Sequence, residues 1–234
     1  MKNKTIQLKV RERLNKASSN DYDNIECWQV VEAFNKGMVQ WCRRQIVGTN
    51  NHKTGDEQNT RRIDDLNVIL KDEEITLTDG GLFYESGKLP SDFFEFKRVD
   101  ADNEDCDCPT PKVFSTYLAK EGNVNMLLRD ENKKPSQSWG ETFCTLIDFK
   151  LRIYTNGEMA FPKAKLTYYK QPIRIQITGC NDPYTLVTST TDVECEFKDD
   201  VVELLIDEAV KILAGDIESF NANGLADQSV EINN

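Results

Sequence analysis

The spacing of apolar residues changes twice along this chain, and the two changes limit the folds open to it more than any other feature. Between Asn24 and Ile46, apolar residues recur at every third or fourth position, which is the spacing of one face of an α-helix. Over residues 73–197 the spacing of two that is typical of β-strands dominates. Helical spacing returns over residues 198–224. The expected order is therefore helices, an inserted β region and a closing helix.

The sequence predicts an α+β fold in which the long N- and C-terminal helices pack together, with an inserted antiparallel β region. Each of the two helices has one apolar face and no other evident partner, so the two faces are expected to bury each other. The side chains expected at this contact are Trp28, Phe34, Met38 and Trp41 in the first helix and Leu205, Ile206, Ala209 and Leu213 in the last.

Four parts are expected along the chain. Residues 1–72 form an N-terminal helical part, 73–197 an inserted β-rich domain, 198–224 a C-terminal helix that packs on the N-terminal helices, and 225–234 a flexible tail. The tail sets isolated apolar residues among polar ones, which is typical of a segment that a partner orders; a frayed terminus is the alternative. The residues expected at such an interface are Leu225, Val230 and Ile232.

Two hairpins are expected in the β region. Asp79-Gly80-Gly81 separates two short strand-like runs and favours a tight turn. Farther along, apolar and polar residues alternate strictly from Phe143 to Ile153, as they do in one strand with one buried face. Asn156-Gly157 then offers a second turn, after which Lys165–Lys170 is expected to return as a strand.

Charge argues against several classes of partner. The chain carries 29 Lys and Arg against 40 Asp and Glu, a formal net charge of −11. Long-range repulsion makes specific binding of DNA, RNA or anionic membranes unexpected. No stretch has the apolar block of a signal peptide or the length of a membrane-spanning helix, so no membrane association is expected.

The residues that carry chemistry form no recognised catalytic motif, phosphate-binding loop or dinucleotide-binding glycine signature. His52, the only histidine, lies in a polar loop and is expected to be exposed and inert. Cys106 and Cys108 lack the spacing of a zinc site, and all seven cysteines are expected to be reduced thiols. The adjacent carboxylates Asp64-Asp65 and Asp199-Asp200 fit the first turns of helices. We therefore expect no catalytic residue, no cofactor and no metal.

Five short motifs carry more information through their order than any one of them carries alone. They are Val30–Lys36 in the first helix, Arg62–Leu66, the Leu-Pro-x-Asp turn in Leu89–Phe94, the strand exit Leu166–Pro172, and the helix start Phe197–Ala209. In this order they resemble the head–tail adaptor, or ring, proteins of short-tailed bacteriophages. That group includes the tail tubular protein A family and the connector rings of crAss-like phages.

The resemblance implies a structural virion protein that is not an enzyme. Such a protein assembles with copies of itself into a ring, expected to have twelve copies, beneath the portal protein and in contact with adjoining tail or ring proteins. The ring joins capsid to tail and leaves a channel through which double-stranded DNA passes without specific binding. The protein is made in the host cytoplasm and ends in the head–tail connector of the virion. The alternative is a soluble enzyme or a cellular binding module with a β-sandwich-like insert.

Overall fold

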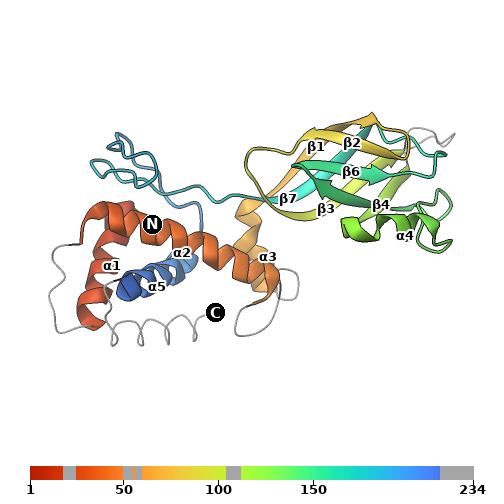
Figure 1. Ribbon diagram of the computed structural model, residues 1–234. Coiled ribbons are helices and arrows are strands. Elements are labelled where there is room, and N and C mark those ends of the chain that lie inside the picture. The colour runs from red at the N-terminus through yellow and green to blue at the C-terminus, as the bar shows by residue number, and fades with distance from the viewer. Residues whose placement is uncertain (18–24, 50–54, 56–59, 104–111, 217–234) are drawn as a thin grey trace. The chain divides into compact units, whose positions relative to one another are not determined.

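Two compact units make up the described part of the protein. One unit is formed by residues 1–68 together with 172–234, and the other by residues 69–171, so the second is inserted into the sequence of the first. Figure 1 shows their helices and strands. The computed structural model describes residues 1–17, 25–49, 55, 60–103 and 112–216.

Helices make up most of the first unit. Their bounds are Asn3–Ala17 for α1, Cys27–Val47 for α2, Thr60–Leu66 for α3 and Asp199–Asp216 for α5. A short 3-10 helix, η1 at Asn67–Ile69, follows α3. None of the helices in the described ranges has the length and apolar character needed to cross a membrane.

Local sequence determines where α2 begins and ends. Glu26 is its N-cap: the Glu26 N–H donates to the Gln29 side chain at 2.9 Å, and the reciprocal bond of a capping box is also present. At the other end, Gly48 adopts a φ of 78° and its N–H donates to the Arg44 carbonyl at 3.0 Å. Glycine suits this position because it has no Cβ that would clash in a left-handed conformation.

The apolar faces of α2 and α5 are buried, and the two helices lie against each other. At their contact, a Cβ added to Gly37 would lie 3.0 Å from the Cβ of Glu208, so the missing side chain permits a close approach. Among the contact residues named from the sequence, Trp28 is only partly buried. The others, which are all buried, are Phe34, Met38, Trp41, Leu205, Ile206, Ala209 and Leu213.

The second unit is a closed β-barrel of seven strands. Every neighbouring pair of these strands is antiparallel except β4 and β5, which run parallel. The chain crosses between β4 and β5 through η2 (Glu121–Asn123) and α4 (Val124–Arg129), because parallel strands need a crossover connection. In order around the barrel, the strands are β1 (Leu70–Asp79), β2 (Phe83–Lys88), β6 (Lys150–Tyr154), β5 (Glu141–Ile147), β4 (Lys112–Leu118), β3 (Phe93–Asn103) and β7 (Lys163–Lys170).

The fold class predicted from the sequence is wrong. The prediction was an α+β fold with long N- and C-terminal helices packed together and an inserted antiparallel β region, whereas the described residues form a closed seven-stranded barrel and five short helices. The barrel is also not purely antiparallel, because β4 and β5 are parallel. Alternating residues report which face of a strand is buried, but they do not report which strand lies beside it. The barrel closes because β1 pairs with β7, and the spacing of apolar residues does not predict this pairing.

Side chains fill the interior of the barrel. Phe114, Phe161 and Tyr168 are fully buried there, and the rings of Phe114 and Phe161 meet edge to face with centroids 5.2 Å apart. In barrels of about eight strands the interior is just wide enough for side chains to fill it, and they do so here. The remaining core residues are Val99, Ala101, Cys144, Leu151, Ile153, Met159, Ala164 and Leu166.

The single strand expected over residues 143–153 is two strands. Asp148 and Phe149 form the turn between β5 and β6, with φ angles of 51° and 55°. Both angles are positive, as a two-residue type I′ hairpin turn requires. Asn156-Gly157 does lie between β6 and β7, but these strands are not neighbours in the barrel, so the hairpin expected between them is wrong.

The connection from β7 to α5 is the 172–198 loop, which belongs to the helical unit although the sequence boundaries placed most of it in the β-rich domain. It folds back on itself through two isolated β-bridges, Gln176 with Val193 and Asn181 with Thr188. The loop is therefore ordered by its own backbone although it contains no regular strand.

Two anchors attach this loop to α2. The side chain of Asn35 accepts the Ile175 N–H at 2.9 Å and donates to the Ile175 carbonyl at 3.2 Å. A disulfide joins Cys180 of the loop to Cys27 at the start of α2. The expectation that all seven cysteines are reduced thiols is thus wrong for this pair, because residues far apart in sequence meet only in the folded unit.

Candidate functional site

The outer face of the parallel strands is covered by α4. Val124 and Leu127 of α4 pack with Phe143 of β5 and Tyr154 of β6 in a small apolar cluster outside the barrel. The rings of Phe143 and Tyr154 stack with centroids 4.7 Å apart. This cluster holds α4 on the strands and so positions the loop that follows it.

That loop, the 130–140 loop, ends in a tight turn built by backbone hydrogen bonds. The Gly140 N–H donates to the Ser136 carbonyl at 3.0 Å, and the Ser136 N–H donates to the Glu141 carbonyl at 3.0 Å. Within this turn the Trp139 N–H donates to the Ser136 hydroxyl at 3.4 Å. The turn therefore presents the Trp139 ring from a defined position.

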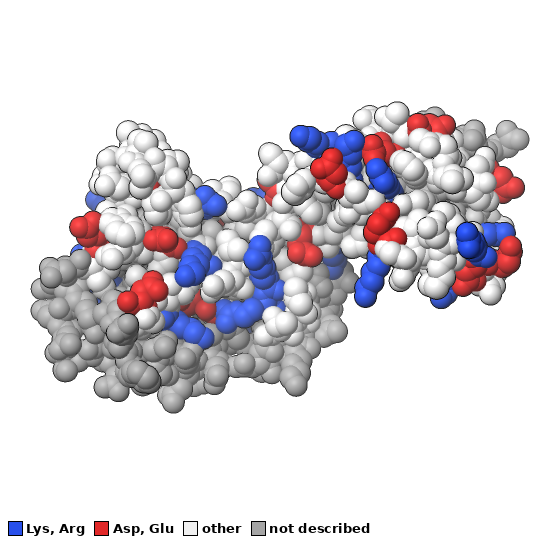
Figure 2. Space-filling model, in the orientation of Figure 1, with Lys and Arg blue, Asp and Glu red and all other residues white. Residues whose placement is uncertain are grey.

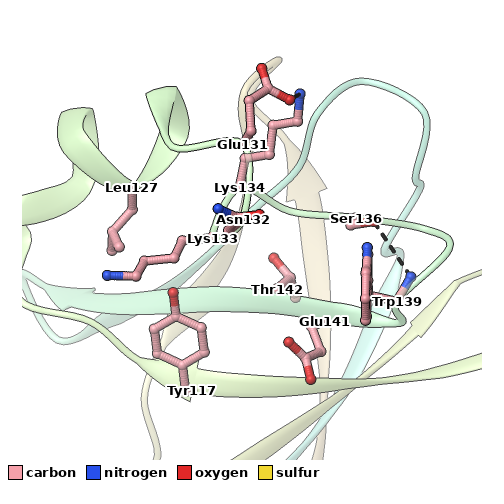
Figure 3. A pocket seen from close by; sticks show the side chains of 10 residues that line it. All are labelled: Tyr117, Leu127, Glu131, Asn132, Lys133, Lys134, Ser136, Trp139, Glu141 and Thr142. Atoms are coloured by element: carbon pink, nitrogen blue, oxygen red, sulfur yellow. Dashed lines mark hydrogen bonds and ion pairs between the residues drawn. The ribbon is translucent and has the colours of Figure 1, made fainter.

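A pocket of about 610 Å³ lies between the 130–140 loop and the strands β4 and β5. Figure 3 shows Trp139 at one end of the pocket, Leu127 at the other, and Tyr117 and Thr142 along the strands between them. Trp139 is 82% exposed and Tyr117 is 45% exposed. Two aromatic rings of this concave surface are thus open to solvent, which makes it the best candidate for a ligand site.

Most of the charges around the pocket are paired with one another. The Lys134 ammonium lies 2.6 Å from the Glu131 carboxylate, and the Lys133 ammonium lies 4.0 Å from the Asp130 carboxylate. Over the barrel face that Figure 2 shows, basic and acidic side chains lie side by side. The pocket therefore has little excess charge of either sign.

Two polar groups remain available on the strand side of the pocket. Partial burial raises the pKa of the Tyr117 hydroxyl above its usual value, and the carboxylates of Glu141 and Asp130 raise it further. The hydroxyl therefore stays protonated at neutral pH and can donate a hydrogen bond. Glu141 supplies a carboxylate acceptor, which Figure 3 draws without a bond to the other lining residues.

A second feature is the exposure of two large apolar side chains where the backbone is strained. Leu186 is 84% exposed at a φ of 58°, and Phe149 is 78% exposed at a φ of 55°. Residues other than Gly, Asn and Asp rarely adopt this conformation, because their Cβ crowds the backbone. Because both side chains are exposed, apolar burial does not offset the cost of this backbone conformation. Backbone strain of this kind is concentrated at functional positions.

Leu186 lies at the tip of the 172–198 loop. The Leu186 N–H donates to the Asp182 carbonyl and the Asp182 N–H donates to the Val187 carbonyl, each at 2.9 Å. Val187 is 65% exposed and Tyr184 is 48% exposed beside it. The Arg174 guanidinium lies 3.9 Å from the centroid of the Tyr184 ring. The tip is an ordered turn that presents three apolar side chains to solvent.

Ion pairs connect the helices of the first unit. Arg13 of α1 contacts Glu203 and Asp207 of α5. Arg44 of α2 contacts Glu208 of α5, whose side chain is 3% exposed, and burial lowers the pKa of Arg44 below its usual value. These charges pair with one another within the helical unit.

The free cysteines of the described residues are buried. They are Cys42, Cys144 and Cys195. Burial raises the pKa of Cys144 to about 12 and that of Cys195 to about 11, and it raises the pKa of Cys42 as well. Because the thiolate is the nucleophile, these cysteines are unreactive at neutral pH.

Several residues singled out from the sequence lie outside the described residues, and their roles stay predictions. They are His52, Cys106, Cys108 and the three expected interface residues Leu225, Val230 and Ile232. The carboxylate pairs are described in part: Asp64 contacts Lys198, and Asp199 lies 2.6 Å from the amino group of Met1. Within the described part of the chain, no cluster of three His, Cys, Asp or Glu side chains is placed to hold a metal ion.

Sequence reasoning missed the residues of the pocket and of the loop tip. Trp139 had a local signal, because it is the one large apolar residue in the polar run Pro135–Gly140. Tyr117 had none, since it lies in a strand-like run where an aromatic residue is ordinary. Leu186 also had none, because its positive φ follows from the fold of the 172–198 loop.

No model of a known protein family matches this sequence, and no curated protein matches it either. The candidate sites are therefore identified by geometry and chemistry. They are the pocket at Trp139 and the exposed apolar tips at Leu186 and Phe149.

Proposed function

We propose that this chain is a structural ring subunit of the portal–tail connector of a short-tailed bacteriophage. In this role it has no catalytic activity. Twelve copies form a ring that contacts the portal protein and the adjoining tail or ring proteins. The protein is made in the host cytoplasm and takes its place in the virion, where the ring leaves a channel for the genome.

The exposure of Leu186 is the observation that carries this proposal. An isolated monomer gains nothing from an apolar side chain that is 84% exposed at a positive φ. A neighbouring copy that covers the tip gains apolar burial without having to order the loop, because backbone hydrogen bonds already hold it. Phe149 presents the same combination on the barrel unit, so each unit supplies one such tip. Contacts between different surfaces of identical copies close into rings when the rotation between them closes.

Two further observations support the role. The ordered series of motifs in the sequence resembles the ring proteins of short-tailed phages. The net charge of −11, repeated around a ring, makes the wall of a channel repel phosphates. DNA that must pass rapidly through the channel is then not held by it.

Assembly of the purified protein tests the proposal. Wild-type protein at high concentration, or mixed with the portal protein of the same virus, is expected to form closed rings in negative-stain images. Leu186→Asn is expected to weaken each contact between subunits by about tenfold or more, which corresponds to roughly 1.4 kcal/mol per contact, so that rings appear only at higher protein concentration. Its thermal transition is expected to stay the same or rise slightly, because asparagine tolerates a positive φ.

Leu8→Gln is the matched control for this substitution. Leu8 is 67% exposed, but it lies in α1 with a helical backbone and is not part of either tip. This variant is expected to assemble like the wild type. A folded wild-type protein that stays monomeric at every concentration and with portal protein present would contradict the proposal, as would full assembly of Leu186→Asn.

A further inference from the structure

The 130–140 loop lines a second pocket besides the one described above. This second pocket, of about 560 Å³, shares Glu131, Lys134, Ser136 and Trp139 with the first. Trp139 therefore lines both pockets. A ligand that contacts both must be extended, and the exposed indole ring is within its reach.

The lining offers neutral hydrogen-bonding groups on the 130–140 loop. They are the Asn132 amide, which lines the first pocket, the Ser136 hydroxyl, which lines both, and the Ser138 hydroxyl, which lines the second. Amides and hydroxyls of this kind both donate and accept, so they suit a ligand with many hydroxyl groups. The Tyr117 hydroxyl adds a donor and the Glu141 carboxylate adds an acceptor.

The charged side chains around the two pockets limit the class of ligand that can bind there. The cations of Lys134 and Lys133 are paired with Glu131 and Asp130, so no group is set apart to hold a phosphate or sulfate. The net charge of −11 also repels anions at long range. A neutral ligand fits this lining better than a nucleotide or a nucleic acid.

We propose that the two pockets bind a neutral oligosaccharide, with one sugar ring stacked on Trp139. The C–H groups of a pyranose form an apolar face that matches an indole, and its hydroxyls point outward to polar partners. Because Trp139 lines both pockets, a sugar stacked on its ring lies within reach of the polar groups of both. This binding activity is additional to the ring-forming role and does not depend on it, because the pocket lies wholly within the barrel unit.

Tryptophan fluorescence gives a direct test, because the three tryptophans differ in exposure. Trp41 is fully buried and Trp28 is partly buried, so quenching by iodide reports mainly on Trp139, which is 82% exposed. The full-length protein is titrated with cellohexaose, maltohexaose and N-acetylchitohexaose. At least one is expected to protect the fluorescence from iodide in a saturable manner.

Calorimetry with the hexasaccharide that binds then identifies the residue responsible. Trp139→Ala is expected to weaken binding by about tenfold or more, and Trp139→Phe is expected to retain most of it because a ring remains. Leu82→Asn is the matched control, since it removes a large exposed apolar side chain of the barrel unit outside both pockets. All variants are expected to keep the wild-type thermal transition, because both side chains are largely in solvent.

Three results would overturn the inference. The first is the absence of saturable binding with all three neutral hexasaccharides. The second is equal affinity of the wild type and Trp139→Ala. The third is binding of a sulfated heparin hexasaccharide alone, which would show an anion site. None of these results bears on ring assembly, so the ring-forming role stands or fails separately.

Discussion

Arg44 and Glu208 place an ion pair in the interior of the helical unit. The side chain of Glu208 is 3% exposed and that of Arg44 is 28% exposed, and the Arg44 Nε is buried without a hydrogen-bond partner among the described residues. Burying two charges costs solvation free energy that their attraction only partly offsets. A buried ion pair therefore adds little to the free energy of unfolding. Removal of one partner nevertheless lowers that free energy strongly, because the other charge stays buried.

Removing one partner therefore has a larger effect than removing both. Arg44→Met is expected to lower the free energy of unfolding by about 2–3 kcal/mol, because Glu208 then keeps its charge without the guanidinium. The double variant Arg44→Met/Glu208→Gln is expected to recover at least half of this loss. Urea unfolding followed by circular dichroism measures both.

The exposed pair of Lys198 and Asp64 provides the control in the same unit. Their side chains are 57% and 64% exposed, so Lys198→Met is expected to change stability by less than about 0.5 kcal/mol. If Arg44→Met costs no more than this control, the buried pair does not behave as its burial implies.

At the scale of elements, the contact between α2 and α5 depends on the absence of a side chain at Gly37. A Cβ there would lie 3.0 Å from the Cβ of Glu208 and 3.4 Å from the backbone nitrogen of Ala209. Glycine in a helix is otherwise unfavourable by roughly 0.5–1 kcal/mol relative to alanine. The close approach of the two helices offsets that cost.

Substitutions at Gly37 and Gly215 are expected to change the free energy of unfolding in opposite directions. Gly37→Val is expected to lower the free energy of unfolding by about 1–3 kcal/mol, because the added atoms force α5 away from α2. A Cβ on Gly215 of α5 would meet nothing within 4 Å, so Gly215→Ala is expected to raise stability by about 0.5 kcal/mol. Thermal unfolding of the two variants compares them directly, and a stabilising Gly37→Val would show that the two helices are less tightly packed.

The elements that the sequence predicted well are those that depend on near neighbours in the chain. Helical spacing located α2 to within a few residues and the start of α5 to within one, whereas residues 217–224 of the predicted last helix lie outside the described residues. Asp79-Gly80-Gly81 correctly marked the hairpin of β1 and β2. The turn at Asp148-Phe149 was missed because it contains no glycine or asparagine, and a two-residue turn leaves the alternation of residues unbroken.

The remaining features depend on residues that meet only after folding. The parallel pairing of β4 and β5 and the closure of β1 on β7 join segments distant in sequence, and neither has a local signal. The candidate pocket follows from that parallel pair, because its crossover carries α4 and the 130–140 loop. Only Trp139, an exposed aromatic residue in a polar run, gave a hint of the site before the fold was known.

At the scale of the whole molecule, the first and last strands of the inserted barrel bring its two chain ends side by side. Leu70 at the start of β1 is paired with Tyr169 near the end of β7. Paired residues in antiparallel strands have Cα atoms only about 4.5–5.5 Å apart. A short linker can therefore replace the whole barrel without stretching the chain.

Residues 69–171 are accordingly expected to fold alone, since their core lies within the barrel. The complementary protein, residues 1–68 joined to 172–234 by a few Gly and Ser residues, is also expected to fold. Circular dichroism and thermal unfolding of each protein provide the measurement, with one cooperative transition expected for each. Aggregation or a gradual, uncooperative transition of the isolated barrel would show that it needs the helical unit.

The same insertion determines the order in which the chain becomes available during synthesis. α2 ends at Val47 and α5 begins at Asp199. At roughly 5–20 residues per second, a ribosome needs on the order of ten seconds to make the residues between them. Throughout that interval the apolar face of α2 is without α5, whereas the barrel is completed first and is free to fold. The helical unit is thus the last part of a nascent chain to mature, and α2 is the segment most in need of a chaperone until it does.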